Sequence, residues 1–274
     1  MNKKIVLKLN LKSILPFRKE IVFIIPSGLL LISMTWLILL ISFSGCKSEK
    51  TNELNQTVLT KTDDKQLTYI LPSPKTEGKV SVEQALAKRR SQRRFVNQEI
   101  TSEQLSQILW AAYGVTEPRA NPSFLRGGLR TAPSAGALYP FEIYVAVGKV
   151  KDIESGVYKY ISQEHKIVRT IEKDVREELC SAALGQDMIK EAPVVIIHSA
   201  IFSRMTGKYG ERGRERYVCI DLGHSAQNIY LQVEALFLGT CAVGAFIDEK
   251  ISQILQLPEN EEPLFLMPVG HYYK

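Results

Sequence analysis

The stretch KRRSQRRF (residues 88–95) points most directly to a fold and to a ligand. It ends a predicted helix that opens at Ser81-x-x-Gln84, a pattern typical of a capping box. Cations in the last turn of a helix complement its macrodipole, so a solvated surface is one interpretation. A phosphate site is the other, because guanidinium groups form charge-assisted bonds worth about 1.5–3 kcal/mol and a serine hydroxyl adds a donor. The residues alone leave both interpretations open.

Beyond this stretch the chain mixes helical and strand-like patterns without a strict β-α-β alternation. This predicts an α+β fold in one domain over residues 80–274. Thr101-x-x-Gln104 opens a second helix, and Gly114 stands where a left-handed cap would end it. A long helix from Glu215 to Leu238 carries apolar residues on most faces, so it is expected to be buried in the core or against a second subunit. A shorter helix is expected near 249–255, and strands are expected at 141–147, 157–161, 166–171, 194–198, 242–247 and 264–269.

The net charge of +6 comes almost wholly from the N-terminus. Residues 1–46 carry six basic side chains and one acidic side chain, which leaves 29 basic and 28 acidic residues in the remaining chain. The basic character therefore belongs to the N-terminal segment. It does not indicate nucleic-acid binding by the folded part.

Residues 21–45 contain no charged side chain. At about 1.5 Å per residue a helix of this length would reach roughly 37 Å, more than a hydrocarbon core of about 30 Å. The sequence FSGC (residues 43–46) resembles a bacterial lipoprotein cleavage box, in which Cys46 would become the lipidated first residue. An uncleaved membrane helix is the alternative, because Phe43 replaces the usual leucine and the leader is long. In both cases the basic flank predicts a domain outside the cytoplasm.

Residues 47–79 are polar and show little periodicity, which predicts a tether between the membrane segment and the domain. Within it, Tyr69-Ile70-Leu71-Pro72 is a candidate for docking on the domain. Three domains or segments are therefore expected, with boundaries at 1–46, 47–79 and 80–274.

Several polar residues predict structure and no chemistry. The cysteines at 180, 219 and 241 lack CxxC or metal spacing and are expected to be small buried residues. His198 and His224 lie in apolar segments and are expected to be core histidines with satisfied hydrogen bonds, because no second metal ligand stands at a suitable spacing. The pair Glu261-Glu262 is expected to lie in a solvated loop.

Three further motifs accompany the arginine-serine stretch Arg89-Arg90-Ser91-x-Arg93-x-Phe95. They are LWAAYG (residues 109–114), PSAGALYP (residues 133–140) and PVG (residues 268–270). Together the four motifs span residues 89–270, essentially the whole globular part. In this combination the sequence resembles the nitroreductase family, in particular the dehydrogenases that oxidise azolines in peptide natural products.

The resemblance implies bound FMN, an α/β sandwich and an intertwined homodimer with flavin at the subunit interface. The residues that would hold the phosphate and ribityl chain are Arg89, Arg90, Ser91 and Arg93. The residues whose backbone would approach the ring system are Pro133, Ser134, Ala135 and Gly136, although residues 131–134 alone indicate a simple turn. Gly244 and Ala245 lie where the family places N–H groups near the flavin N5 and O4 edge, and such donors stabilise charge on reduced flavin.

The segment KYGERGRERY (residues 208–217) interleaves glycines with charges, which by itself indicates a mobile surface loop. In the azoline dehydrogenases a Lys-Tyr pair at the matching place is implicated in removing a proton while hydride passes to flavin. The resemblance therefore makes Lys208 and Tyr209 the candidate catalytic residues. An ammonium group beside a phenol suits this role, because burial can lower a lysine pKa towards that of a usable base.

The sequence thus predicts a membrane-anchored, FMN-dependent oxidoreductase that transfers hydride through flavin N5 to or from a small molecule. Reduction of nitro- or quinone-like acceptors and dehydrogenation of a substrate both remain open, and Lys208 and Tyr209 favour dehydrogenation. The alternative is a surface lipoprotein that uses a flavin fold for binding or electron transfer without turnover. A domain outside the cytoplasm would need an electron source other than cytoplasmic NAD(P)H. Neither nucleic acid nor a metal ion is an expected partner.

Overall fold

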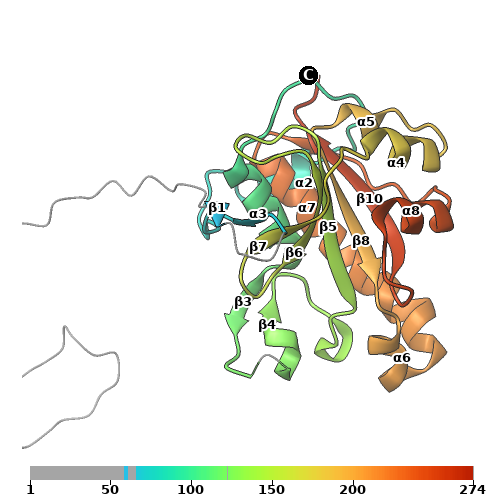
Figure 1. Ribbon diagram of the computed structural model, residues 1–274. Coiled ribbons are helices and arrows are strands. Elements are labelled where there is room, and N and C mark those ends of the chain that lie inside the picture. The colour runs from blue at the N-terminus through green and yellow to red at the C-terminus, as the bar shows by residue number, and fades with distance from the viewer. Residues whose placement is uncertain (1–58, 61–65, 122, 274) are drawn as a thin grey trace, which may run out of the picture. The chain divides into compact units, whose positions relative to one another are not determined.

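The computed structural model describes residues 59–60, 66–121 and 123–273 (Figure 1). The predicted membrane segment, Cys46 and the first part of the tether lie outside these residues. Within the described part of the chain, no helix is long and apolar enough to cross a membrane.

An eight-stranded antiparallel sheet forms the middle layer, in the order β1-β2-β7-β6-β5-β8-β10-β9. In chain order the strands are β1 (Leu59–Thr60), β2 (Thr68–Ile70), β5 (Phe141–Val147), β6 (Gly156–Ile161), β7 (Lys166–Ile171), β8 (Val194–Ala200), β9 (Gly239–Thr240) and β10 (Glu262–Gly270). The predicted hairpin is β6 and β7, with Tyr160 opposite Ile167. A separate two-stranded sheet joins β3 (Val115–Pro118) to β4 (Gly128–Arg130).

Helices cover both faces of the large sheet (Figure 1). Because successive side chains of a strand point to opposite faces, Val145 of β5 packs into one core cluster while Tyr144 and Ala146 pack into the other. The first face carries α2 (Val82–Lys88), α3 (Ser102–Tyr113) and α7 (Cys219–Ala235), and the second carries α4 (Arg176–Ala182), α5 (Met188–Glu191) and α8 (Asp248–Leu255). The result is a three-layer α+β sandwich.

The predicted start of α3 is confirmed, but its predicted end is wrong. Thr101 and Gln104 form the capping box in both directions, with N···O distances of 2.9 and 3.2 Å. Gly114 does not adopt a left-handed conformation (φ −66°, ψ 150°), because the chain continues directly into β3. Glycine is needed there for another reason, since a Cβ would lie 2.3 Å from Cδ1 of Trp110.

The long predicted helix begins at Gly213 as a π-helical segment, η3 (Gly213–Val218), and continues as α7. It is buried on one face, whereas Ile220 is 47% exposed in the single chain. The strand predicted at 242–247 is wrong. The ladder with β10 stops at Thr240, because the next backbone donor, Ala242 N–H, bonds to the hydroxyl of Tyr230 (2.8 Å).

The segment expected to dock on the domain does so. Tyr69 is 1% exposed, packs edge-on against Tyr158 and lies in β2, which pairs with β7. Further contacts follow, because Leu71 N–H donates to His165 O (3.1 Å) and the carbonyl of Pro72 accepts from the Ser106 hydroxyl (2.5 Å). The last part of the predicted tether therefore belongs to the folded unit.

Local pattern misplaced three polar side chains. Cys219 and His224 are exposed on the outer face of α7, whereas Cys180 and Cys241 are buried as predicted. Glu261 is only 5% exposed, because the turn before β10 folds it over the sheet. Its carboxylate accepts from Tyr144 Oη and Ser199 Oγ at 2.9 Å each and pairs with Lys159 Nζ at 3.2 Å.

His198 is a core histidine, as predicted. Its Nε2 lies 2.8 Å from Ser225 Oγ, and burial lowers its pKa to about 4. Its hydrogen bonding is only half satisfied, because Nδ1 is buried without a partner in the described part of the chain.

Candidate active site

The arginine-serine stretch leaves α2 and runs alongside β9. Ser91 bridges to Thr240, and Gln92 N–H donates to Thr240 O at 2.9 Å. Tyr230 of α7 joins the two segments, because its hydroxyl lies 3.3 Å from Ser91 Oγ and accepts from Ala242 N–H. The fold therefore brings residues 89–92 against the segment that leads to Gly244 and Ala245.

The cations of this stretch fit a phosphate. Arg89 lies over the Tyr230 ring, 5.3 Å from its centroid, and Arg90 donates to the carbonyl oxygens of Ala87 and Arg89. In the part of the chain that the structure describes, no ion pair with a carboxylate involves Arg89, Arg90 or Arg93. Guanidinium groups that no carboxylate neutralises, next to a serine hydroxyl, are the donors that a phosphate needs.

The loop that follows β4 is tightly turned at η2 (Ala135–Ala137). Gly136 has a φ of 62°, a left-handed conformation that favours glycine. Asp221 of α7 holds the start of this loop, since both of its carboxylate oxygens lie 3.2 Å from Ala135 N. Within the loop, Ser134 Oγ accepts from Tyr139 N–H at 3.0 Å.

Lys208 and Tyr209 converge on this loop. They lie at the end of α6 (Ser203–Tyr209), and a Cβ placed on Gly136 would be 2.7 Å from Tyr209 Oη and 2.9 Å from Lys208 Nζ. Arg204 fixes α6 to the same loop by donating to the carbonyl oxygens of Tyr139 (3.3 Å) and Pro140 (3.4 Å). The candidate catalytic pair and the predicted flavin-contacting loop therefore form one cluster.

Two expectations about residues 208–217 are wrong for the single chain. The segment is not a loop throughout, because Gly213 begins the π-helix and packs against the backbone of Met205, where a Cβ would meet it at 2.9 Å. Lys208 is exposed. The burial that was expected to favour its neutral amine is therefore not present in one chain.

Gly244 and Ala245 are exposed at the turn before α8. Gly244 has room for a side chain, because a Cβ would lie 3.4 Å from Phe265, an ordinary contact. Gly239 is the glycine that a close approach requires, since its Cβ would lie 2.7 Å from Gln92. In the single chain this close approach seats the arginine-serine stretch and is not aimed at a ligand.

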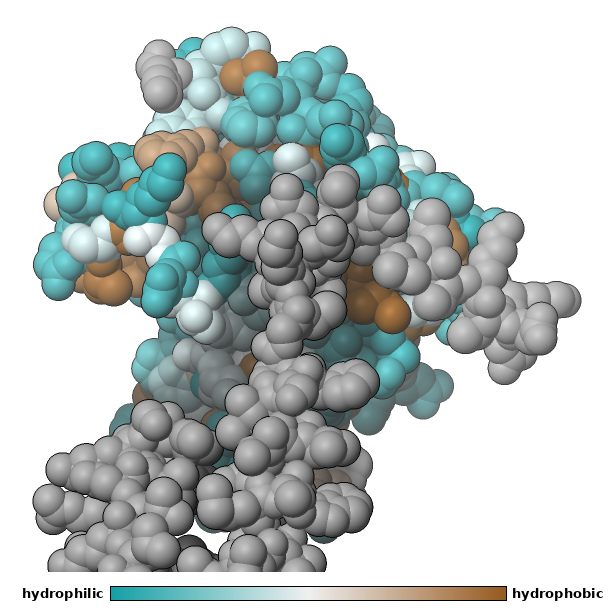
Figure 2. Space-filling model, turned by 90° about the vertical axis from the view of Figure 1, so that its left-hand side faces the viewer, coloured by the Kyte–Doolittle hydropathy of each residue, from teal (hydrophilic) through white to brown (hydrophobic). Residues whose placement is uncertain are grey.

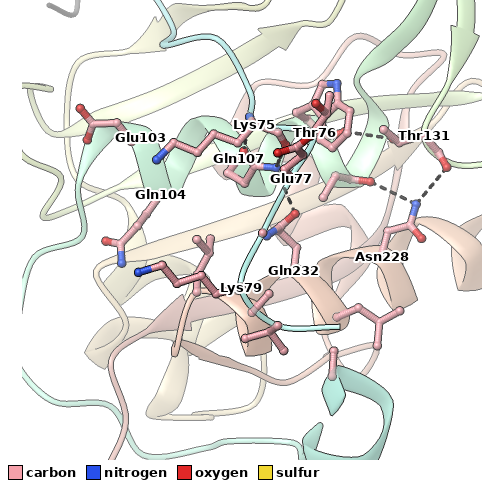
Figure 3. A pocket seen from close by; sticks show the side chains of 18 of the residues that line it. Lys75, Thr76, Glu77, Lys79, Glu103, Gln104, Gln107, Thr131, Asn228 and Gln232 are labelled. Atoms are coloured by element: carbon pink, nitrogen blue, oxygen red, sulfur yellow. Dashed lines mark hydrogen bonds between the residues drawn. The ribbon is translucent and has the colours of Figure 1, made fainter. Parts of the chain in front are cut away.

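The two halves of the predicted site lie at different points along α7. Asp221 holds the loop at residues 134–136, and Tyr230 holds Ser91. Nine residues of α-helix separate them, or about 13.5 Å along the axis. A cavity of about 800 Å³ opens between them, lined by α3, α7 and residues 72–82 (Figure 3). None of the sequence-predicted site residues lines it.

Figure 3 shows how α7 is joined to its neighbours beside this cavity. Asn228 Nδ2 donates to Thr131 O at 3.2 Å, and Gln232 Oε1 accepts from Gln107 Nε2 at 3.1 Å. Gln107 also bonds to both backbone groups of Lys75 and so fastens the segment before α2.

Sequence reasoning missed Asp221 and Tyr230. A carboxylate on the apolar stripe of a long helix is a detectable signal for Asp221, since an ionisable residue is rarely buried without a specific partner. Nothing in the local sequence distinguishes Tyr230 from any other tyrosine on a helix.

The nitroreductase family model matches residues 86–271, and the chain belongs to this family. The nitroreductase-like protein MJ1384 of Methanocaldococcus jannaschii is 49% identical over 191 residues, which are 70% of this chain and 91% of that protein. A nitroreductase structure from Ralstonia eutropha has a TM-score of 0.63 at 28% identity and covers 76% of this chain and 90% of that chain. The predicted nitroreductase-like α+β sandwich is thereby confirmed.

A third relative comes from peptide biosynthesis. The trifolitoxin-processing protein TfxB of Rhizobium leguminosarum bv. trifolii is 31% identical over 134 residues, which are 47% of this chain and 35% of that protein. The match spans about a third of TfxB.

Proposed function

We propose that the protein is an FMN-dependent oxidoreductase that transfers hydride to or from a small molecule. One observation carries the proposal: Lys208 Nζ and Tyr209 Oη converge on Gly136, in the loop that family resemblance places at the flavin ring. A flavin site needs a hydride carrier and a proton-handling group side by side. This cluster supplies the second.

The residues present fit FMN at its phosphate end. Arg89, Ser91 and Arg93 would hold the phosphate, because the cations have no carboxylate partner in the described part of the chain and the hydroxyl is already oriented by Tyr230. Backbone at residues 133–136 and 244–245 would contact the ring. When bound, FMN supplies a two-electron carrier that exchanges hydride at N5.

Lys208 and Tyr209 would hold or move the proton that accompanies the hydride. In dehydrogenation the lysine amine or the tyrosine oxygen accepts a proton from the substrate, and in reduction the same groups donate one. The match to TfxB favours dehydrogenation of a peptide-derived heterocycle over reduction of nitro- or quinone-like acceptors. Lys208→Ala and Tyr209→Phe would therefore abolish dehydrogenation while FMN content stays at the wild-type level. Unchanged dehydrogenation in both variants would contradict these roles.

We further propose that the working form is a homodimer. About 13.5 Å of helix separates the two halves of the site in one chain, so a second copy is needed to bring one half against the other. Apolar side chains are exposed near this helix in the single chain: Val82 (62%), Leu86 (52%) and Phe237 (69%). Figure 2 shows hydrophobic residues among mainly hydrophilic ones on the side of the domain it faces. Light scattering that gave a monomer with bound FMN would contradict the proposal.

The anchoring of the chain is a separate proposal. Cys46 would be lipidated after cleavage, or residues 21–45 would stay as a membrane helix, with the domain outside the cytoplasm. Cys46→Ser would release the domain from the membrane fraction under the first alternative and leave it bound under the second. Protection from protease on intact cells would contradict the outside location.

The second candidate function is a surface lipoprotein that binds flavin for electron transfer without its own turnover. The exposure of Lys208 in the single chain is the observation that favours it. Flavin that is reduced by dithionite but exchanges electrons with no added substrate, in wild type and in Lys208→Ala alike, would support this candidate.

A further inference from the structure

Asp221 is a buried carboxylate with no role in the chemistry described above. It is 2% exposed and lies on the face of α7 that packs against the sheet. In the described part of the chain its carboxylate forms no ion pair, and its partners are donors of one loop. Both oxygens lie 3.2 Å from Ala135 N, and the Ser134 side chain bonds to the same carboxylate.

The bonds continue into the loop. Ser134 Oγ accepts from Tyr139 N–H at 3.0 Å, so its own hydroxyl hydrogen is free to point at Asp221. The chain of bonds then runs from Tyr139 through Ser134 to Asp221, with Ala135 as a second donor. One carboxylate thereby sets the positions of residues 134, 135 and 139.

This loop needs such support. Three of its residues have left-handed φ angles: Gly136 (62°), Ala137 (54°) and Tyr139 (48°). Residues other than glycine rarely adopt this conformation, and it persists only where the surroundings impose it. The strain is concentrated next to Gly136, the point on which Lys208 and Tyr209 converge.

We infer that Asp221 is a positioning residue that holds residues 134–139 in the left-handed turn and so sets Gly136 against Lys208 Nζ and Tyr209 Oη. The carboxylate is well suited to this, because it accepts from two donors at once and its burial excludes competing water. Burial also raises the pKa of Asp221, and the bonds from Ser134 and Ala135 oppose that rise, so the carboxylate depends on the loop as the loop depends on it.

The inference predicts which amides lose protection when the bonds are removed. Hydrogen exchange of the full chain is measured in Asp221→Ala, Asp221→Asn and Ser134→Ala. Asp221→Ala should speed exchange at Ala135 and Tyr139 by roughly 10- to 100-fold, the range expected for losing bonds to a charged acceptor. Ser134→Ala should expose Tyr139 and leave Ala135 protected, and Asp221→Asn should give intermediate rates at both.

Ser225→Ala is the matched control, because Ser225 is also buried on α7 but bonds to Ala112 O and His198. It should leave Ala135 and Tyr139 at the rates set by global unfolding. If Asp221→Ala fails to fold, Asp221→Asn and Ser134→Ala carry the test. Wild-type exchange at Ala135 and Tyr139 in the folded Asp221 variants would overturn the inference.

The consequence for the cofactor rests on the proposed function and is measured separately. FMN titrated into flavin-free full chain should bind roughly tenfold more weakly to Asp221→Ala than to Ser225→Ala. Faster exchange in the loop together with unchanged FMN affinity would leave the positioning role intact. It would contradict the placement of flavin at this loop, and the two failures are thus told apart.

Discussion

Replacing Gly136 with alanine would displace the candidate catalytic pair while leaving the rest of the fold in place. Gly136 has a left-handed φ of 62°, and the added Cβ would lie 2.7 Å from Tyr209 Oη and 2.9 Å from Lys208 Nζ. Both atoms are the far ends of flexible side chains, so they can move without disturbing the core. The substitution therefore tests position and not folding.

The expected magnitudes follow from the geometry. A left-handed alanine costs about 1–2 kcal/mol, which lowers Tm by roughly 2–8 °C in a domain of this size. To reach an ordinary contact of about 3.4 Å, Tyr209 Oη must move by about 0.7 Å and Lys208 Nζ by about 0.5 Å. Misplacement of reacting groups by about 1 Å can lower a rate by roughly 100-fold. We therefore expect a small loss of stability and a loss of rate between ~10- and ~100-fold.

The assay is the oxidation of pre-reduced flavin by a quinone, followed at the flavin absorption band, because it needs no knowledge of the natural electron donor. Gly185→Ala is the control, since Gly185 has a φ of 73° and no atom lies within 4 Å of its added Cβ. The two variants should lose similar stability, but only Gly136→Ala should lose rate. Equal rates in both variants would refute the placement of the reaction at Gly136.

Three further outcomes follow from buried groups. Glu261→Ala should lower the free energy of unfolding by about 2–4 kcal/mol in urea, because Tyr144, Ser199 and Lys159 lose their acceptor; a loss below about 1 kcal/mol would contradict its structural role. Because burial lowers the pKa of His198 to about 4, its stabilising contribution is complete above about pH 6.5. It should fall by about 1.4 kcal/mol per pH unit down to about pH 4, and a wild-type slope in His198→Gln would argue against this. Tyr230→Phe should weaken FMN binding about fivefold, since it removes a bond of about 1 kcal/mol that orients Ser91 and Ala242, and unchanged titration curves would contradict it.

Most of the fold could be predicted where a local pattern decides the structure. The capping box at Thr101 and Gln104 starts α3, and the alternation over residues 141–147 makes β5, because each pattern determines its own hydrogen bonds and its own buried face. Gly114 and residues 242–247 were predicted wrongly because distant contacts decide them. Trp110 crowds Gly114, and Tyr230 takes the backbone donor that would have extended β9.

The candidate site was predicted less evenly. The arginine-serine stretch is visible from composition, but Lys208 and Tyr209 entered only through the resemblance, since a glycine-rich charged segment does not distinguish a catalytic pair from a surface. The structure added what no local pattern contains, namely that Gly136 lies against that pair. Asp221 and Tyr230 were missed because their roles lie in contacts with residues 86 and 139 positions away along the chain.

The central claim is that residues 80–274 form an FMN-dependent nitroreductase-family domain. The visible absorption spectrum of residues 47–274, purified without added flavin, tests it most directly. The account predicts flavin bands at a stoichiometry near one FMN per chain, and it predicts their loss when Arg89 and Arg93 are both replaced with alanine. A folded but colourless protein that takes up no added FMN would contradict it.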